Sequence, residues 1–162
     1  MVGKKILKSS TQLLLDELVN HGASSASLLL YQDDKLIQHQ TTCEKWQDFY
    51  AGIPDVIHDC HIKRQGIILA NQNVRNFTLV WDLLIPDNDH SLYLNEERER
   101  FNHCHGISIC KTLPNNQTMG IILTGRRHET DFAYRVIKNK YKVSTVMKAN
   151  YYNSTRSQFT KD

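Results

Sequence analysis

The chain has 162 residues, of which 40% are hydrophobic and 23% charged, and its net charge is +3. These values are typical of a folded globular protein and exclude collagen, coiled coils and disordered chains. The charge is too small to predict direct contact with nucleic acid. No apolar run is long enough for a membrane span or a secretion signal, so we expect a cytoplasmic protein with reduced cysteines. We predict one domain over residues 1–152 and a flexible tail or linker over residues 153–162.

The first predicted element is a helix that begins at Ser9 or Ser10. Both serines can accept a hydrogen bond from the first free backbone N–H groups of a helix, and Gly22 can end it. Apolar residues recur at helical spacing between these ends, which predicts one buried face. The expected core contacts are Leu13, Leu14, Leu18 and Val19.

A β-hairpin and a second helix follow. Residues 27–31 and 35–40 flank a polar turn, which is typical of two antiparallel strands. Thr42 can cap a helix over residues 43–50. Residues 53–65 show no clear period, and we expect them to be irregular.

The middle of the chain is harder to interpret. Residues 67–70 and 77–84 are apolar enough for a strand or a helix, and periodicity leaves both open. Residues 87–91 are polar and predict a turn. Asn95 can cap a charged helix over residues 96–104.

The last third predicts a second β-hairpin and a final helix. Residues 106–113 and 118–124 flank a turn that contains proline and two asparagines, and residues 129–152 are helical in composition. Hairpins separated by helices indicate an antiparallel sheet covered by helices, which is an α+β domain.

No catalytic or phosphate-binding motif is present in the sequence. Seven side chains are candidate metal ligands: His58, Cys60, His61, His103, Cys104, His105 and Cys110. Adjacent ligands rarely reach one ion together and no C-x-x-C pair occurs, so we predict no metal and no cofactor. Cys104 lies between two histidines, but neighbours in sequence seldom align as a nucleophile and its base, and we predict no catalytic residue.

An aromatic and acidic set is the strongest candidate for a binding site. Trp46 and Tyr50 are four residues apart and would share one face of the second helix. Asp59 follows nine residues later. Indole and phenol groups donate hydrogen bonds and a carboxylate accepts them, so the set suits a small, partly apolar ligand with both carbonyl and N–H groups.

The spacing Trp46-x3-Tyr50-x8-Asp59 resembles the ligand-binding motif in the N-terminal sensor domain of LuxR-type quorum-sensing regulators. Gly106 matches a glycine that precedes a sheet strand in that family, and Trp81 is a candidate for its second pocket tryptophan. The resemblance implies an α/β/α sandwich with a PAS- or GAF-like, mostly antiparallel five-stranded sheet. It also implies that the tryptophan and aspartate hold the carbonyl and amide of an acyl-homoserine lactone.

The resemblance therefore implies a non-catalytic, small-molecule-sensing regulatory domain. Its ligand would be an acyl-homoserine lactone or another amphipathic molecule, lying between the sheet and the helices. The expected partners are a second copy of the domain or a DNA-binding domain. We expect this domain itself to contact neither a membrane nor nucleic acid. Two alternatives stay open: a protein-interaction domain of the same fold with a filled pocket, and a small hydrolase or transferase using the histidine and cysteine sets.

Overall fold

The structure is a computed structural model that describes residues 9–33, 35–139, 143 and 148. Within this part of the chain, five strands form one antiparallel sheet in the order β2-β1-β5-β4-β3. The strands are β1 (Ser25–Gln32), β2 (Lys35–Thr41), β3 (Asn76–Val80), β4 (Cys104–Leu113) and β5 (Gln117–Gly125). The α+β architecture and the five-stranded antiparallel sheet expected above are confirmed.

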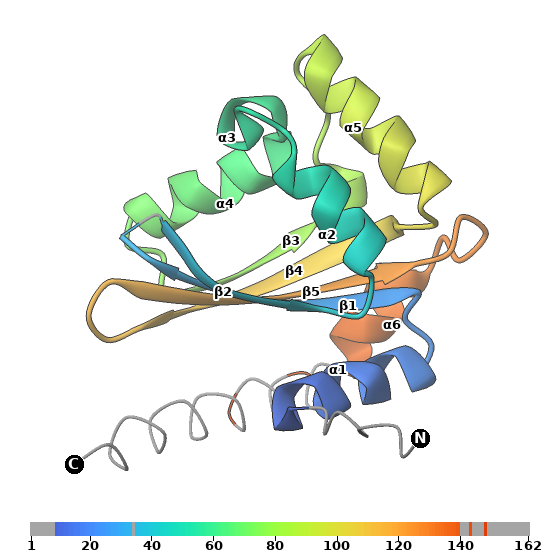
Figure 1. Cartoon of the computed structure of the whole chain (residues 1–162), viewed down its shortest axis with the longest axis horizontal. Helices are drawn as coiled ribbons and strands as arrows, with labels where there is room; N and C mark the ends of the chain where they lie inside the picture. The colour runs from blue at the N-terminus through green and yellow to red at the C-terminus, as the bar shows by residue number, and fades with distance from the viewer. Residues whose placement is uncertain (1–8, 34, 140–142, 144–147, 149–162) are drawn as a thin grey trace, which may run out of the picture.

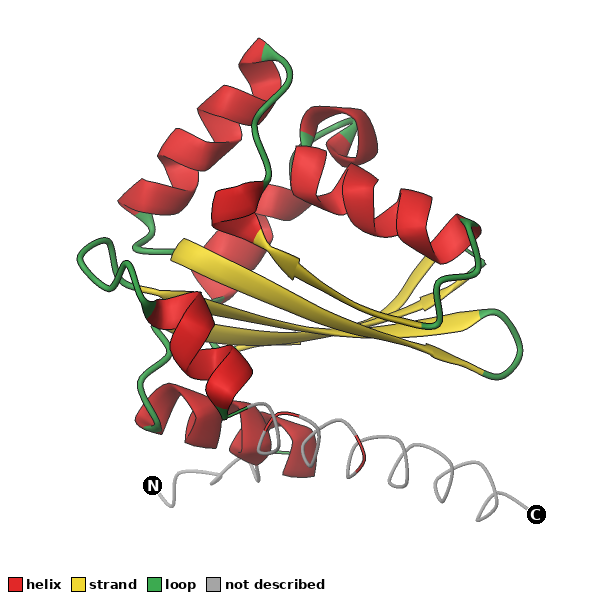
Figure 2. Ribbon diagram, turned by 180° about the vertical axis from the view of Figure 1, so that it is seen from behind, coloured by secondary structure: helices red, strands yellow, loops and turns green. Residues whose placement is uncertain are grey.

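Helices cover both faces of the sheet (Figure 1). Above one face lie α2 (Glu44–Ala51), α3 (Val56–Asp59), α4 (His61–Asn71) and α5 (Asp89–Arg100). On the opposite face lie α1 (Ser10–Asn20) and α6 (Phe132–Lys138), and Figure 2 shows the same three layers from behind. A short 3-10 helix, η1 (Trp81–Leu83), directly follows β3.

The two faces of the sheet carry different side chains, because successive residues of a strand point to opposite sides. On the α1 and α6 side, the central strands bury apolar residues, most of them large, in one core: Ala26, Leu28, Leu30, Ile107, Met119, Ile121 and Leu123. The alternate positions face α2 to α5 and are mostly small or polar. A second, smaller apolar cluster lies on that side: Cys60, Ile62, Leu79 and Leu94.

The predicted first helix and both hairpins are confirmed. Ser9 caps α1, and its hydroxyl oxygen accepts a hydrogen bond from the backbone N–H of Gln12 at 3.1 Å. Strands β1 and β2 pair across the first predicted turn, and β4 and β5 pair across the second. Turn residues and strand alternation are local signals, which explains why the sequence alone was sufficient here.

The expectation that residues 53–65 are irregular is wrong, because α3 and the start of α4 occupy them. Both helices have side-chain caps. The Asp55 carboxylate accepts from the backbone N–H of His58 at 3.2 Å, and the Cys60 sulfur accepts from that of Lys63 at 3.4 Å. The structure also decides between strand and helix for the two ambiguous segments. Residues 67–70 belong to α4, and residues 77–84 contain most of β3 followed by η1.

The expected turn over residues 87–91 and the helix over residues 96–104 also need correction. Helix α5 already begins at Asp89, because the Asn88 side chain caps it by accepting from the backbone N–H of Ser91 at 2.8 Å. Asn95 therefore lies inside the helix and is not its cap. Helix α5 ends at Arg100, four residues earlier than expected.

Two further expectations concern helix ends. Thr42 does not cap α2: the capping position is Cys43, and the Thr42 hydroxyl accepts from the backbone N–H of Ala26 at 2.9 Å. The final helix is described as α6, and most of the remainder of the expected helix over residues 129–152 lies outside the described residues, as does the tail over residues 153–162. Among the residues that are described, no helix is long and apolar enough to cross a membrane.

Candidate ligand-binding site

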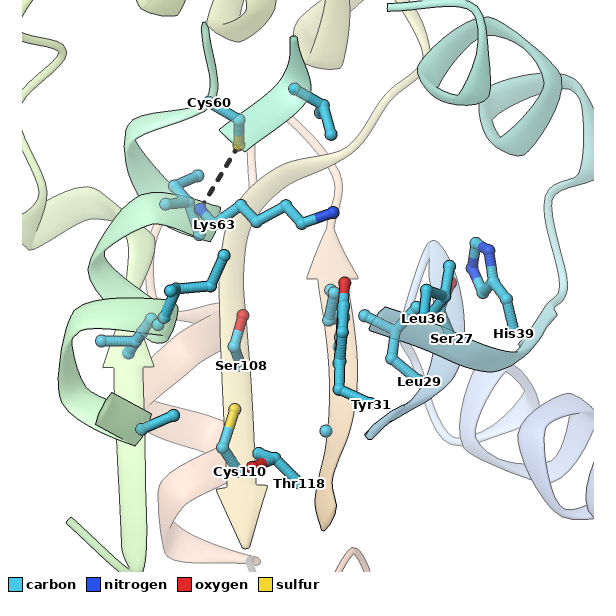
Figure 3. A pocket seen from close by; sticks show the side chains of 18 of the residues that line it. Ser27, Leu29, Tyr31, Leu36, His39, Cys60, Lys63, Ser108, Cys110 and Thr118 are labelled. Atoms are coloured by element: carbon cyan, nitrogen blue, oxygen red, sulfur yellow. Dashed lines mark hydrogen bonds between the residues drawn. The ribbon is translucent and has the colours of Figure 1, made fainter. Parts of the chain in front are cut away.

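A cavity of about 690 Å³ lies between the sheet and the helices α2 to α5. Binding sites for small molecules in proteins have volumes of roughly 300–1,000 Å³. Its floor comes from all five strands and its roof mainly from α2 and α4. In Figure 3, Lys63 reaches from α4 across the opening, while Ser27, Tyr31, Ser108 and Cys110 rise from the strands. An open cavity argues against the alternative of a filled pocket.

The cavity has its volume in part because many of the sheet residues that face the helices are small. The small floor residues are Ser25, Ser27, Ser108, Cys110, Thr118, Gly120 and Thr124, and larger ones such as Leu29 and Ile122 lie between them. Aliphatic residues of the size found on the opposite face would fill this space. Strands that alternate between large aliphatic and small polar residues therefore give both a core and a cavity from the same backbone.

One end of the cavity is aromatic and is organised around Trp46. On α2, the Trp46 ring lies 5.3 Å from the Phe49 ring and 5.6 Å from the Tyr50 ring, measured between centroids. It also meets Phe101 at 5.2 Å and His103 at 5.4 Å, both edge-on. Trp46, Tyr50 and His103 line the cavity. The i, i+4 spacing therefore places Trp46 and Tyr50 together, as expected.

Trp81 closes the same end from η1. Its indole N–H donates to the Ser108 hydroxyl at 2.9 Å, and it lines the cavity together with Trp46. Gly106 does not line the cavity, but it makes the position of Trp81 possible. A Cβ atom at Gly106 would lie 2.2 Å from a ring carbon of Trp81. Glycine is thus required by a close approach of the indole to the β4 backbone.

Replacing Gly106 by alanine should displace Trp81. We expect a loss of about 1–3 kcal/mol in the free energy of unfolding, the usual cost of overpacking. The indole should also leave Ser108, which would change its fluorescence. Chemical unfolding of the variant, followed by tryptophan emission, measures both effects. Gly120→Ala is the matched control, because a Cβ atom there would lie 3.5 Å from the Cys110 sulfur, which is an ordinary van der Waals contact. Equal stability of the two variants would contradict this role of Gly106.

Asp59 is not among the residues that line the cavity. It is the last residue of α3, and its carboxylate lies 3.4 Å from the His58 ring nitrogen. Its backbone carbonyl accepts from the Ser91 hydroxyl at 2.8 Å, which ties α3 to α5. The next residue, Cys60, lines the cavity instead. The structure thus brings three of the five predicted ligand-binding residues to the cavity wall, namely Trp46, Tyr50 and Trp81.

Burial shifts the titrating groups of the cavity toward their neutral forms. It raises the pKa of Tyr31 to about 12 and the pKa of Tyr50 well above its ordinary value, so both phenols stay protonated donors. It lowers the pKa of Lys63. Burial, together with the charge of Arg98, lowers the pKa of His103 to about 4, so this imidazole is neutral at pH 7.

Arg98 was not among the residues predicted from the sequence, but it lies in the cavity wall and is only 4% exposed. It projects from α5, a helix that is highly charged overall. The available signal was the spacing: Ser91, Leu94 and Arg98 recur at three and four residues, and all three are buried. That periodicity marks one face of a helix even when the composition suggests a fully solvated one.

The geometry gives no support to catalysis by Cys104. Burial and the nearby Glu99 raise the pKa of its thiol, whereas a nucleophilic cysteine needs a lowered one. Its neighbour His105 is engaged elsewhere, with ring nitrogens 2.8 Å from Asp82 and 3.0 Å from the Arg127 carbonyl. Cys104 does not line the cavity. In the described part of the chain, no group of three or more metal-binding side chains could hold an ion.

No family model and no curated protein sequence matches this chain. The fold, however, is that of the ligand-binding domains of LuxR-family regulators. The N-acylhomoserine lactone dependent LuxR-family transcription factor CepR2 from Burkholderia cenocepacia has a TM-score of 0.59 at 14% identity, with 84% of this chain and 79% of that chain covered.

Two other solved structures are similar. The VqsR LBD domain from Pseudomonas aeruginosa has a TM-score of 0.58 at 11% identity, covering 87% of this chain and 86% of that one. SdiA of Escherichia coli has a TM-score of 0.55 at 13% identity, covering 88% of this chain. The chain spans only 63% of the SdiA chain. These likenesses establish a shared architecture.

Proposed function

We propose that this domain is a non-catalytic sensor that binds a small amphipathic molecule in the cavity between the sheet and α2 to α5. The observation that carries the proposal is the open cavity of about 690 Å³, whose wall combines aliphatic and aromatic side chains with hydroxyl, amide and charged groups. The similarity in fold to a regulator described as dependent on N-acylhomoserine lactones is consistent with it.

The proposed contacts follow from the cavity wall. Trp46 and Trp81 offer flat apolar surfaces at one end, and the protonated Tyr50 phenol is a hydrogen-bond donor there. Asp59 lies outside the wall, and its backbone carbonyl, which any residue would supply, ties α3 to α5, so we propose no ligand contact for its side chain. Ligand binding would tie the helical layer to the sheet, and the signal would pass to a second copy of the domain or to a DNA-binding domain.

A cavity-filling variant tests the proposal. Gly66 lines the cavity from α4, and a Cβ there has ordinary contacts, so Gly66→Phe should fold with its ring in the ligand space. Ile68→Phe is the matched control, because Ile68 is on the same helix, is 43% exposed and does not line the cavity.

Wild type and both variants are titrated with acyl-homoserine lactones, fatty acids and fatty-acid methyl esters while the melting temperature is recorded. A ligand at a hundred times its Kd stabilises the folded state by about 2.7 kcal/mol, or roughly 5–10 °C for a chain of this size. We expect that shift for at least one probe in wild type and in Ile68→Phe, and none in Gly66→Phe. No shift in wild type, or equal shifts in all three proteins, would contradict a sensor role of the cavity.

A further inference from the structure

Arg98 is a charged side chain in the wall of the cavity, and it is 4% exposed. A guanidinium stays protonated at any physiological pH, so it cannot lose its charge on burial as a lysine or histidine can. Buried charges in proteins are usually paired with an opposite charge. The partners of the Arg98 guanidinium therefore show whether its charge is paired.

The hydrogen-bond partners of Arg98 include no carboxylate. Its Nη1 donates to the Asn95 side-chain oxygen at 2.7 Å, and its Nη2 donates to the Cys60 sulfur at 3.0 Å. The Nε group is buried and has no hydrogen-bond partner among the residues that the structure describes. Among the described residues, none of the ion pairs involves Arg98. Within this part of the chain, no carboxylate pairs with the charge of Arg98.

Aromatic rings fix the guanidinium in place. Its central carbon lies 5.9 Å from the Trp46 ring and 5.2 Å from the Trp81 ring, at the aromatic end of the cavity. Both distances are within the range of a cation–π interaction. The rings hold the group in one position and stabilise it in part, but they carry no formal negative charge to pair with it.

The cavity as a whole has the same sign. Among the described residues that line it, Arg98 and Lys63 are the cationic side chains, and His103 is neutral. The acidic residue in this described lining is Asp33, which is exposed at the β1–β2 turn. Figure 3 shows Lys63 pointing into the cavity, and its Nζ lies 5.4 Å from the centre of the Tyr31 ring. A positive, partly apolar cavity favours an anion with an apolar tail.

We propose that the ligand is an amphipathic carboxylate whose head group pairs with Arg98 and whose apolar tail lies along the remaining wall. The tail would contact aliphatic and aromatic residues such as Leu29, Ile67, Phe77 and Ile122. This inference rests on the sensor function proposed above and specifies its ligand. A carboxylate would accept charge-assisted hydrogen bonds from the guanidinium, which are stronger than those of a neutral carbonyl. A neutral lactone would leave the charge unpaired.

The test compares dodecanoate, methyl dodecanoate and N-decanoyl homoserine lactone by calorimetric titration at neutral pH. The acid and the ester share a chain and differ in charge, so their comparison in wild type needs no variant. We expect the acid to bind roughly ten- to a hundredfold more tightly than the ester. Arg98→Met should lose this preference, with the acid weakened more than the ester, and Arg98→Lys should keep part of it.

Lys63→Met is the matched control, because it removes the other cation of the cavity. We expect Lys63→Met to weaken the preference for the acid less than Arg98→Met does, because Lys63 adds to the positive charge of the cavity but does not pair with the head group. A larger loss of the preference in Lys63→Met than in Arg98→Met would overturn the assignment to Arg98. Equal or tighter binding of the ester or the lactone by wild type would overturn the carboxylate proposal and leave the sensor function intact. Binding of none of the three probes would contradict both proposals.

Discussion

Replacing Leu15 by alanine is expected to destabilise the protein by about 2–5 kcal/mol, the usual range for a leucine deleted from a packed core. Leu15 lies on α1 and is fully buried, at 0% exposure, against the sheet face opposite the cavity. Because α1 and α6 cover this face together, the resulting void cannot be filled by solvent or by an exposed side chain. Urea unfolding monitored by circular dichroism gives the difference.

Leu13→Ala is the control for this prediction. Leu13 is on the same helix but is 57% exposed, so its truncation should change the free energy of unfolding by no more than about 0.5 kcal/mol. Both variants make the same chemical change and have the same effect on helix propensity. If the two lost the same stability, α1 would not be docked on the sheet as described.

The second large effect is a loss of stability in mild acid caused by His103. Its pKa is about 4 in the folded protein, against about 6.5 for an unperturbed histidine. The unfolded state therefore binds more protons between these two values, and stability falls as the pH falls from about 6.5 to about 4. Between pH 7 and pH 5, this group alone should remove about 2 kcal/mol.

His103→Gln separates this effect from the rest of the molecule. Glutamine does not titrate, so the free energy of unfolding of the variant should fall by about 2 kcal/mol less than that of wild type between pH 7 and pH 5. Burial also lowers the pKa of His39 and His61, and both proteins keep that contribution. Parallel pH profiles for the two proteins would show that His103 is not held neutral by its surroundings.

The parts of the fold that could be predicted from sequence are those with a local signal. The hairpins β1–β2 and β4–β5 follow from strand alternation around polar turns. The face of α1 was only partly predicted: Leu18 is buried and Leu14 and Val19 pack against the core, while Leu13 is exposed and the fully buried leucine is Leu15. With apolar residues at three consecutive positions, periodicity leaves the exact direction of the face open.

The middle of the chain could not be predicted, because its helices depend on tertiary contacts. The four residues of α3 and the start of α4 follow one another closely, and the cap between them is Cys60, which is not a residue that normally signals a helix start. The candidate site divides in the same way. Local i, i+4 spacing was enough to pair Trp46 with Tyr50, but the contribution of Arg98 depends on how α5 packs, which the sequence does not state.

The two-sided sheet has a consequence for how ligand preference can change. Residues such as Cys110 and Thr118 line the cavity, while their strand neighbours pack in the core on the other side. A substitution at one of these two positions changes the shape of the cavity with little disturbance of the packing that stabilises the fold. Cavity shape and stability are therefore encoded at alternating positions of the same strands, so the ligand preference of the proposed sensor can be redesigned while its scaffold is retained.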